Sequence, residues 1–236
     1  MDQRIKKEAE ALVGALSARG WRACTAESCT GGLVSAAITE VRGSSAAFKG
    51  GAVCYANEVK SSILGVNEEI FATKGAVSAE CAEAMAQGAA TLFSTHLAIA
   101  LTGIAGPGGG SPQKPVGTVF ICVTIRDGGR FFPMVVENHF SGSREEIRKQ
   151  SVLKALRLAN AALAGEIYDD LPQPLLSRES QTCQVAEEDL VTCDDDPHPL
   201  VFPPFFADTL CDLITVSDDE LVEIEESELD FDEGYD

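Results

Sequence analysis

The chain has 236 residues, of which 45% are hydrophobic and 23% charged, a composition typical of a soluble globular protein. No apolar run approaches the roughly 20 residues that a membrane-spanning helix needs, which excludes such a helix. The first residues lead into an amphipathic pattern, so we expect no secretory signal. Eight cysteines are too few for a disulfide scaffold, and we expect reduced thiols in a cytoplasmic protein.

The charge is distributed unevenly along the chain. Residues 165–236 contain 23 acidic side chains and one basic side chain, whereas residues 1–164 contain 14 acidic and 17 basic side chains. We therefore predict a nearly neutral domain at 1–164 and a flexible, acidic, proline-containing tail at 165–236. Such a tail repels nucleic acid and anionic membranes, so neither is an expected partner.

The first part of the chain alternates between helical and strand patterns. In chain order, we expect a helix (5–16), a strand (21–26), a tight turn (27–32), a helix (33–41), a strand (51–55) and a short helix (58–64).

The second part ends in a hairpin and a long helix. We expect a helix (79–93), a buried strand (96–101), a glycine-rich loop (102–110), two strands (116–126 and 130–140) and a last helix (144–164). The Asp-Gly-Gly turn between the last two strands predicts an antiparallel pair, and Ser143 with Glu146 predicts a capping box. This order of elements indicates an α/β layered domain with a mixed sheet.

Three segments place turn residues at the carboxyl end of an expected strand, where open α/β sheets bind ligands: 27–32, 55–60 and 102–110. In the first, Ser28 precedes a helix, and backbone amides there stabilise anions. Capping of the helix by Ser28 is a second interpretation, and a common one. The neighbouring Cys29 is intrinsically a stronger nucleophile, but small buried cysteines at such turns usually have a packing role.

A nucleophilic serine needs a base, and none of the three histidines lies in a motif that suits one. The remaining candidate is Lys60, which follows Tyr55 at the start of a short helix and must be neutral to accept a proton. The alternatives are a solvated surface lysine and an aromatic residue at the edge of the core.

The loop at 102–110 is rich enough in glycine for its backbone to approach a ligand closely. It matches neither the phosphate loop of nucleotide hydrolases nor a dinucleotide fingerprint. Arg144 and Arg148, one turn apart, are suited to hold a phosphate or carboxylate, although pairing with Glu145 or solvent is the commoner role. No cysteine spacing fits a zinc site.

Four segments occur in a distinctive order: AESCTGG (26–32), YANEVK (55–60), TGIAGP (102–107) and PVGTV (115–119). Together they resemble the CinA C-terminal domain family over about residues 4–164. The resemblance implies a three-layer α/β/α domain. Characterised members are nicotinamide-nucleotide amidohydrolases, which occur alone or fused to a molybdopterin-binding-like domain, and we expect the stand-alone form here.

The resemblance also implies an activity in pyridine nucleotide salvage: hydrolysis of nicotinamide mononucleotide (NMN) to nicotinate mononucleotide and ammonia. It assigns Ser28 as nucleophile, Lys60 as general base and Tyr55 as a proton-relaying or orienting partner. The amides at Thr30, Gly31 and Gly32 would hold the oxyanion. The ribose phosphate would contact residues of the glycine-rich loop and the last helix, namely Thr102, Gly103, Gly106, Gly108, Arg144 and Arg148. No metal or organic cofactor is required, and a homodimer is expected from the resemblance alone.

Two other functions remain open at this point. A non-catalytic pyridine-nucleotide-binding module would bind NMN without releasing ammonia. The tail contains short β-prone runs followed by acids, at 213–226, which resemble SUMO-interaction motifs and suggest a protein partner. A short-chain dehydrogenase is excluded because the glycine fingerprint is missing and the spacing from Tyr55 to Lys60 is wrong.

Overall fold

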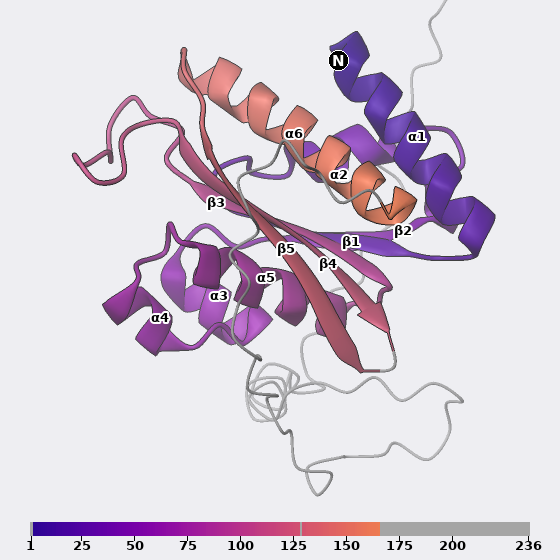
Figure 1. Cartoon of the computed structure of the whole chain (residues 1–236), viewed down its shortest axis with the longest axis horizontal. Helices are drawn as coiled ribbons and strands as arrows, with labels where there is room; N and C mark the ends of the chain where they lie inside the picture. Colours follow the sequence, from indigo (N-terminus) through magenta and orange to yellow (C-terminus); the bar gives the residue numbers. More distant parts are fainter. Residues whose placement is uncertain (1, 128, 166–236) are drawn as a thin grey trace, which may run out of the picture. The chain divides into compact units, whose positions relative to one another are not determined.

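The computed structural model describes residues 2–127 and 129–165, which form a five-stranded sheet with helices on both faces (Figure 1). The strands are β1 (Ala23–Glu27), β2 (Phe48–Val53), β3 (Leu97–Gly103), β4 (Thr118–Asp127) and β5 (Arg130–His139). Their order across the sheet is β2-β1-β3-β4-β5. β1 pairs in parallel with β2 and β3, whereas β4 runs antiparallel to β3 and β5. The three-layer α/β/α fold with a mixed sheet, expected from the sequence, is therefore confirmed.

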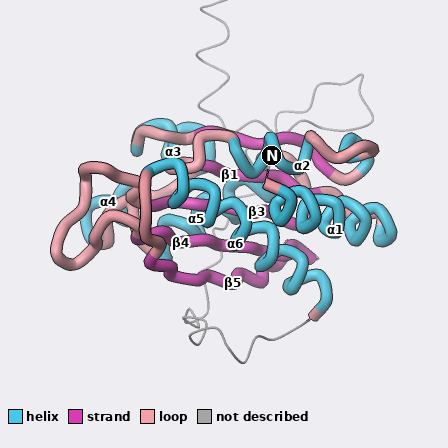
Figure 2. Tube along the Cα trace, turned by 90° about the horizontal axis from the view of Figure 1, so that it is seen from above, coloured by secondary structure: helices cyan, strands magenta, loops and turns pink. Residues whose placement is uncertain are grey.

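One face of the sheet is covered by α1 (Gln3–Arg19), α2 (Leu33–Thr39) and α6 (Arg144–Ala164). Alternate residues of β3, Leu97, Ile99 and Leu101, pack against these helices because successive strand side chains point to opposite faces. α1 and α6 lie side by side, as Figure 2 shows from above, and Arg19 Nη2 donates to the carbonyl of Leu163 at 2.8 Å.

The other face carries α3 (Asn57–Leu64), α4 (Glu68–Thr73) and α5 (Ala79–Leu92). Four fully buried alanines let α5 lie close to the sheet: Ala82, Ala86, Ala89 and Ala90. A glycine brings α5 against α3 in the same way. A Cβ atom on Gly88 would lie 1.9 Å from the carbonyl oxygen of Leu64.

The predicted elements are present, including short ones such as α3, and two short elements were not expected. α6 has the expected bounds, and its capping box between Ser143 and Glu146 is present. The sequence analysis missed the 3-10 turn Ser44–Ala46 and helix α4, and β2 starts earlier than expected, at Phe48. In the part of the chain that the structure describes, no helix is long and apolar enough to span a membrane. The predicted tail, including the segment at 213–226, lies outside the described residues.

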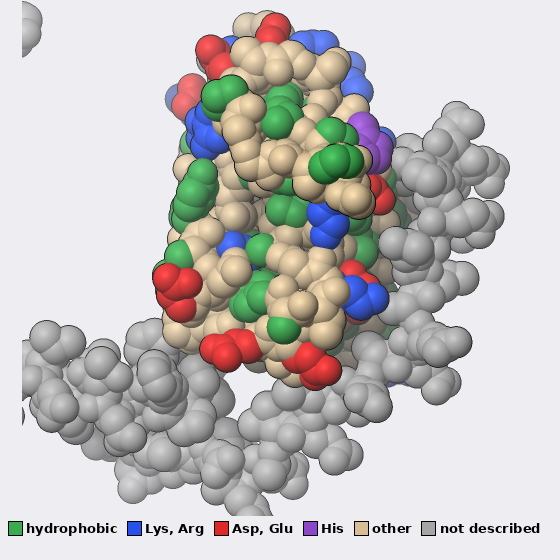
Figure 3. Space-filling view, turned by 90° about the vertical axis from the view of Figure 1, so that its left-hand side faces the viewer, with side chains coloured by type: hydrophobic (Ala, Val, Ile, Leu, Met, Phe, Trp, Pro, Cys, Tyr) green, Lys and Arg blue, Asp and Glu red, His purple; other side chains and the backbone are tan. Residues whose placement is uncertain are grey.

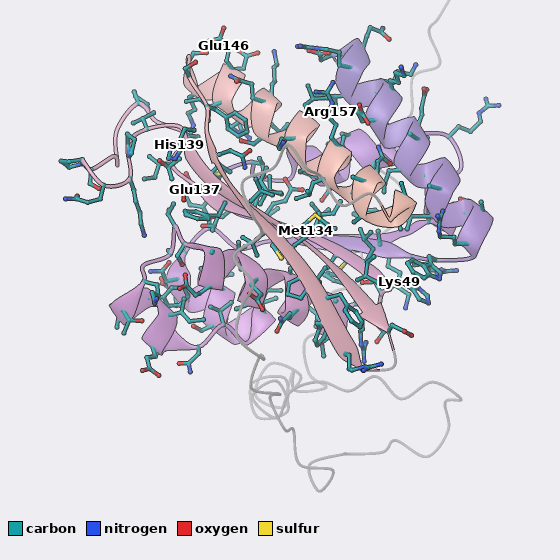
Figure 4. The ribbon with its side chains drawn as sticks, viewed as in Figure 1. Lys49, Met134, Glu137, His139, Glu146 and Arg157 are labelled. Carbon is teal, nitrogen blue, oxygen red and sulfur yellow. The ribbon has the colours of Figure 1, made fainter. Side chains whose placement is uncertain are left out.

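The parallel strands β2, β1 and β3 end at the same edge of the sheet, and the loops that follow them meet there. The glycine-rich loop after β3 projects from this edge, and α6 begins beside it. Figure 4 shows His139 and Glu146 toward this end of the molecule and Lys49 toward the opposite end. Chemistry-bearing residues from distant parts of the sequence are thus gathered at one end.

Close packing of α5 on α3 gives the first testable prediction. Gly88→Ala should lower the free energy of unfolding by about 1–3 kcal/mol, because the added methyl group meets rigid backbone. Gly14→Ala is the matched control, since Gly14 lies in the exposed interior of α1 with nothing within 4 Å of an added Cβ. It should raise stability by about 0.5–1 kcal/mol. Urea unfolding followed by circular dichroism measures both, and equal effects would contradict the packing described.

Candidate functional site

Ser28 lies directly after β1 in a turn that reverses the chain into α2. The residue is 8% exposed, and its amide donates to the carbonyl of Leu101 on β3 at 3.0 Å. Its carbonyl accepts from the amide of Gly31 at 3.1 Å. The turn requires left-handed backbone at Gly31 (φ 59°) and Gly32 (φ 93°), which other residues rarely adopt. The two glycines therefore fix the path that presents the Ser28 side chain.

Ser28 does not cap α2, so the interpretation of Ser28 as a capping residue is wrong. The N-cap is Gly32, which has no side chain to accept a hydrogen bond. The buried carboxylate of Glu27 accepts instead from the amides of Gly32, Val34 and Ser35, at 3.0, 3.0 and 2.8 Å. The sequence analysis missed this role of Glu27. The signal that could have indicated it is a helix start with glycine at the capping position and a carboxylate five residues earlier.

Two backbone amides of the turn donate to other residues, and two do not. Gly31 donates to Ser28 and Gly32 donates to Glu27, although we expected both amides to hold an oxyanion. The amides of Cys29 and Thr30 donate to no other residue in the described part of the chain. The Thr30 hydroxyl is buried and has no hydrogen-bond partner among the described residues. The turn thus places beside Ser28, on its carboxyl side, two amides that no other described residue uses.

Cys29 is poorly suited to act as the nucleophile. The residue is 6% exposed, and burial raises the pKa of its thiol to about 11, although its own backbone amide, Arg148 and Arg144 lower it. The thiolate, which is the reactive form, is therefore scarce near neutral pH. This favours Ser28 as the reactive side chain of the turn.

Lys60 is buried in α3, with 1% of its surface exposed, so the solvated-lysine interpretation is wrong. Its Nζ donates to the carbonyl of Tyr55 at 3.0 Å and forms no ion pair with a described carboxylate. Burial raises the pKa of the nearby thiols of Cys54 and Cys81, and the charge of Lys60 opposes that rise. Lys60 and Ser28 are not hydrogen-bonded to each other.

Tyr55 and Arg144 join two of the loops to α6. Tyr55 is 63% exposed, and its hydroxyl accepts from Arg144 Nη2 at 3.2 Å. Arg144 Nη1 donates to the carbonyl of Gly106 in the glycine-rich loop at 2.7 Å. The alternative pairing of Arg144 with Glu145 is not formed, since Glu145 pairs with Lys149. The arginine therefore contacts the residues that the sequence placed in the site.

Arg148 reaches the Ser28 turn from the next turn of α6. Its Nη2 donates to the carbonyl of Thr30 at 2.7 Å, and a Cβ on Gly31 would lie 3.3 Å from the same nitrogen. Its Nε is buried and has no hydrogen-bond partner among the described residues. Figure 3 views this end of the molecule, where acidic side chains lie around the border and basic ones lie both at the border and nearer the middle.

Three other residues were predicted to contact the ligand. Two of them, Thr102 and Gly103, pack against other parts of the protein, and the third, Gly108, has no close neighbour. Thr102 is 1% exposed, and its hydroxyl donates to the carbonyl of Ala76 at 2.7 Å. Gly103 packs on β4, where an added Cβ would lie 2.7 Å from the carbonyl oxygen of Thr118. Nothing lies within 4 Å of an added Cβ at Gly108. Within the described ranges, no group of three or more His, Cys, Asp or Glu residues is arranged to hold a metal ion.

The sequence profile of the CinA C-terminal domain matches residues 5–163. The chain belongs to this family. It is 48% identical over 141 residues to a "CinA-like protein" of Mycolicibacterium gilvum, a match that covers 60% of this chain and 33% of the relative. It is 50% identical over 144 residues to a "CinA-like protein" of a Mycobacterium species, covering 61% of this chain and 34% of that protein. The chain thus spans about a third of the length of these curated relatives.

Solved structures of CinA proteins share the fold. The competence/damage inducible protein CihA of Agrobacterium tumefaciens has a TM-score of 0.65 and 41% identity, and covers 68% of this chain and 96% of its own. A CinA superfamily protein of Klebsiella pneumoniae has a TM-score of 0.64 and 35% identity, covering 69% and 99%. The CinA fold described above accounts for nearly the whole of those chains.

The raised pKa of Cys29 gives the second prediction. Raising a thiol pKa from 9.0 to about 11 lowers the thiolate fraction at pH 8 about a hundredfold. Iodoacetamide at pH 8 should therefore modify Cys29 at least about tenfold more slowly in the folded chain than in the chain unfolded in urea. Peptide mass spectrometry over a time course measures both rates. Equal rates would show that the thiol is accessible and ionised in the folded protein.

Proposed function

We propose that this CinA domain is a serine amidohydrolase that converts NMN and water into nicotinate mononucleotide and ammonia. The observation that carries the proposal is the placement of Ser28, which lies beside the free amides of Cys29 and Thr30 at the edge where three parallel strands end. A hydroxyl next to free backbone donors suits attack on a carboxamide. Resemblance to characterised amidohydrolases of the family supports NMN as the substrate.

Lys60 is the proposed base. Lys60 is buried and forms no ion pair with a described carboxylate, and the role of base requires its neutral amine. The amine is held at the carbonyl of Tyr55, and the proposal requires it to meet Ser28 when substrate is bound. Catalytic hydrogen bonds often form only in the substrate complex.

The reaction would proceed in two steps. Ser28 Oγ attacks the carboxamide carbon and gives its proton to Lys60, while the Cys29 and Thr30 amides stabilise the oxyanion. The carbon–nitrogen bond then breaks, and the proton returns to the leaving nitrogen, so that ammonia departs and an ester on Ser28 remains. Water cleaves this ester with Lys60 again accepting a proton, which yields nicotinate mononucleotide and restores the Ser28 hydroxyl.

The phosphate of the substrate would bind beside α6. Arg144 is exposed, and its guanidinium donates to the Tyr55 hydroxyl and to the Gly106 carbonyl. Arg148 carries an Nε without a partner among the described residues, next to the Ser28 turn. Guanidinium groups bind phosphate through paired hydrogen bonds. We therefore assign Arg144 to the phosphate and Arg148 to support of the turn, with Tyr55 held by Arg144 at the rim.

The third prediction tests the nucleophile and the base. Ser28→Ala and Lys60→Met should each lower kcat for ammonia release from NMN by at least about a thousandfold, because each removes a group required for acyl transfer. Ammonia and nicotinate mononucleotide are measured together, and they should appear in equal amounts. Thermal unfolding establishes that the variants are folded.

Cys29→Ala separates the two candidate nucleophiles. It should retain turnover within about tenfold, since only its backbone amide takes part. Normal turnover in Ser28→Ala would refute the proposal. NMN binding by the unaltered chain without ammonia release would instead identify the non-catalytic binding module.

The fourth prediction concerns the phosphate. Arg144→Gln should raise KM for NMN about tenfold or more and change KM for nicotinamide riboside, which lacks the phosphate, by less than about twofold. Lys149→Gln is the matched control, because Lys149 is an exposed cation of the same helix that pairs with Glu145. It should leave both KM values within about twofold. An equal rise of both KM values in Arg144→Gln would place the phosphate elsewhere.

A further inference from the structure

The carboxylate of Glu27 is fully buried, with 0% of the residue exposed, and it accepts four hydrogen bonds. Three come from the amides of Gly32, Val34 and Ser35, and the fourth comes from Ser35 Oγ at 2.8 Å. No described cation forms an ion pair with it. A buried carboxylate is costly unless it is well hydrogen-bonded, so these four donors are what stabilises it in place.

The backbone of Glu27 is rigid because strands flank it on both sides. It pairs with Val53 on β2 and with Leu101 on β3, and its carbonyl accepts from the amide of Cys54 at 2.8 Å. Its side chain spans the Ser28 turn and ends at the start of α2. Glu27 thus joins the fixed strand before Ser28 to the fixed helix after it.

Ser35, which donates to the Glu27 carboxylate, is itself held by a further hydrogen bond. Ser35 Oγ also contacts Thr25 Oγ1 at 2.7 Å, on the strand two residues before Glu27. Gly51 of β2 leaves the space for this contact, since an added Cβ would lie 2.0 Å from Thr25 Oγ1 and 2.7 Å from Ser35 Oγ. The network therefore runs from β1 through Glu27 and Ser35 to the first turn of α2.

We propose that Glu27 is a positioning residue for the serine hydrolysis. By holding the amides of Gly32, Val34 and Ser35, its carboxylate fixes the turn so that Ser28 Oγ and the free amides of Cys29 and Thr30 face the same point. This inference rests on the proposed function, since it assigns Glu27 to the same site. Glu27 itself does not touch the substrate. A misplacement of about 1 Å costs such a site about a hundredfold in rate.

The fifth prediction is a selective loss of kcat in Glu27→Gln. The amide side chain has the same shape but replaces one acceptor oxygen with a donor, which faces the N–H groups that the carboxylate accepts from. We expect kcat for NMN to fall about 30–100-fold and KM to change by less than about threefold. The rate at which a fluorophosphonate labels Ser28 should fall by a similar factor. Both are measured below the onset of thermal unfolding.

Glu83→Gln is the matched control. Glu83 is a partly buried glutamate of α5 whose carboxylate accepts from Gln87 at 2.9 Å, and burial raises its pKa. This variant should leave turnover and labelling within about twofold, so that loss in Glu27→Gln is not a general effect of a buried amide. Ser35→Ala, which removes one of the four hydrogen bonds, should give an intermediate loss of kcat.

The outcomes separate this inference from the proposed function. Unchanged kcat and labelling in Glu27→Gln, with only a lower Tm, would reduce Glu27 to a structural role and overturn the inference. If the unaltered chain is labelled at Ser28 but does not hydrolyse NMN, the proposed function fails, and the ratio of labelling rates still decides the role of Glu27. If the unaltered chain shows neither labelling nor turnover, both are overturned.

Discussion

The parallel pairing of β1 with both β2 and β3 is the constraint on which the site depends. It makes three strands end at one edge, so that the Ser28 turn, the Tyr55–Lys60 segment and the glycine-rich loop meet although the sequence separates them. The antiparallel strands β4 and β5 then lead the chain back to α6, whose first turns carry Arg144 and Arg148 to the same edge. The strand order therefore determines which residues meet at this edge.

Small residues let the layers approach closely enough for these contacts to form. Gly51 makes room for the contact between Thr25 and Ser35, and Gly31 makes room for the Arg148 guanidinium. On the far face, the alanines of α5 and the close approach at Gly88 bring α3, which carries Lys60, against the sheet. Lys60 lies in this helix with 1% of the residue exposed, and its Nζ donates to the carbonyl of Tyr55.

The sequence predicted those parts of the structure that depend on local patterns. The α6 capping box and the β4–β5 hairpin follow from residues a few positions apart, and the structure contains both. Helix α4 was missed because it is short, although Asn67 caps it in the usual way. The strand order and the contact of Tyr55 with Arg144, 89 residues apart, depend on tertiary packing that no local pattern records.

The contrast between local patterns and tertiary packing also explains why the amides of Gly31 and Gly32 are not the oxyanion donors that the sequence suggested. Four and five residues after β1, Gly31 and Gly32 look like suitable anion donors, because glycine at a helix start exposes its amide. In the folded chain, their amides are used by Ser28 and Glu27 to build the turn, and the donors left over are those of Cys29 and Thr30. The glycines therefore serve the chemistry through backbone conformation and not as donors. The four donors around Glu27 stabilise its buried carboxylate beside this turn, and the carboxylate's charge adds to burial in raising the pKa of the Cys29 thiol.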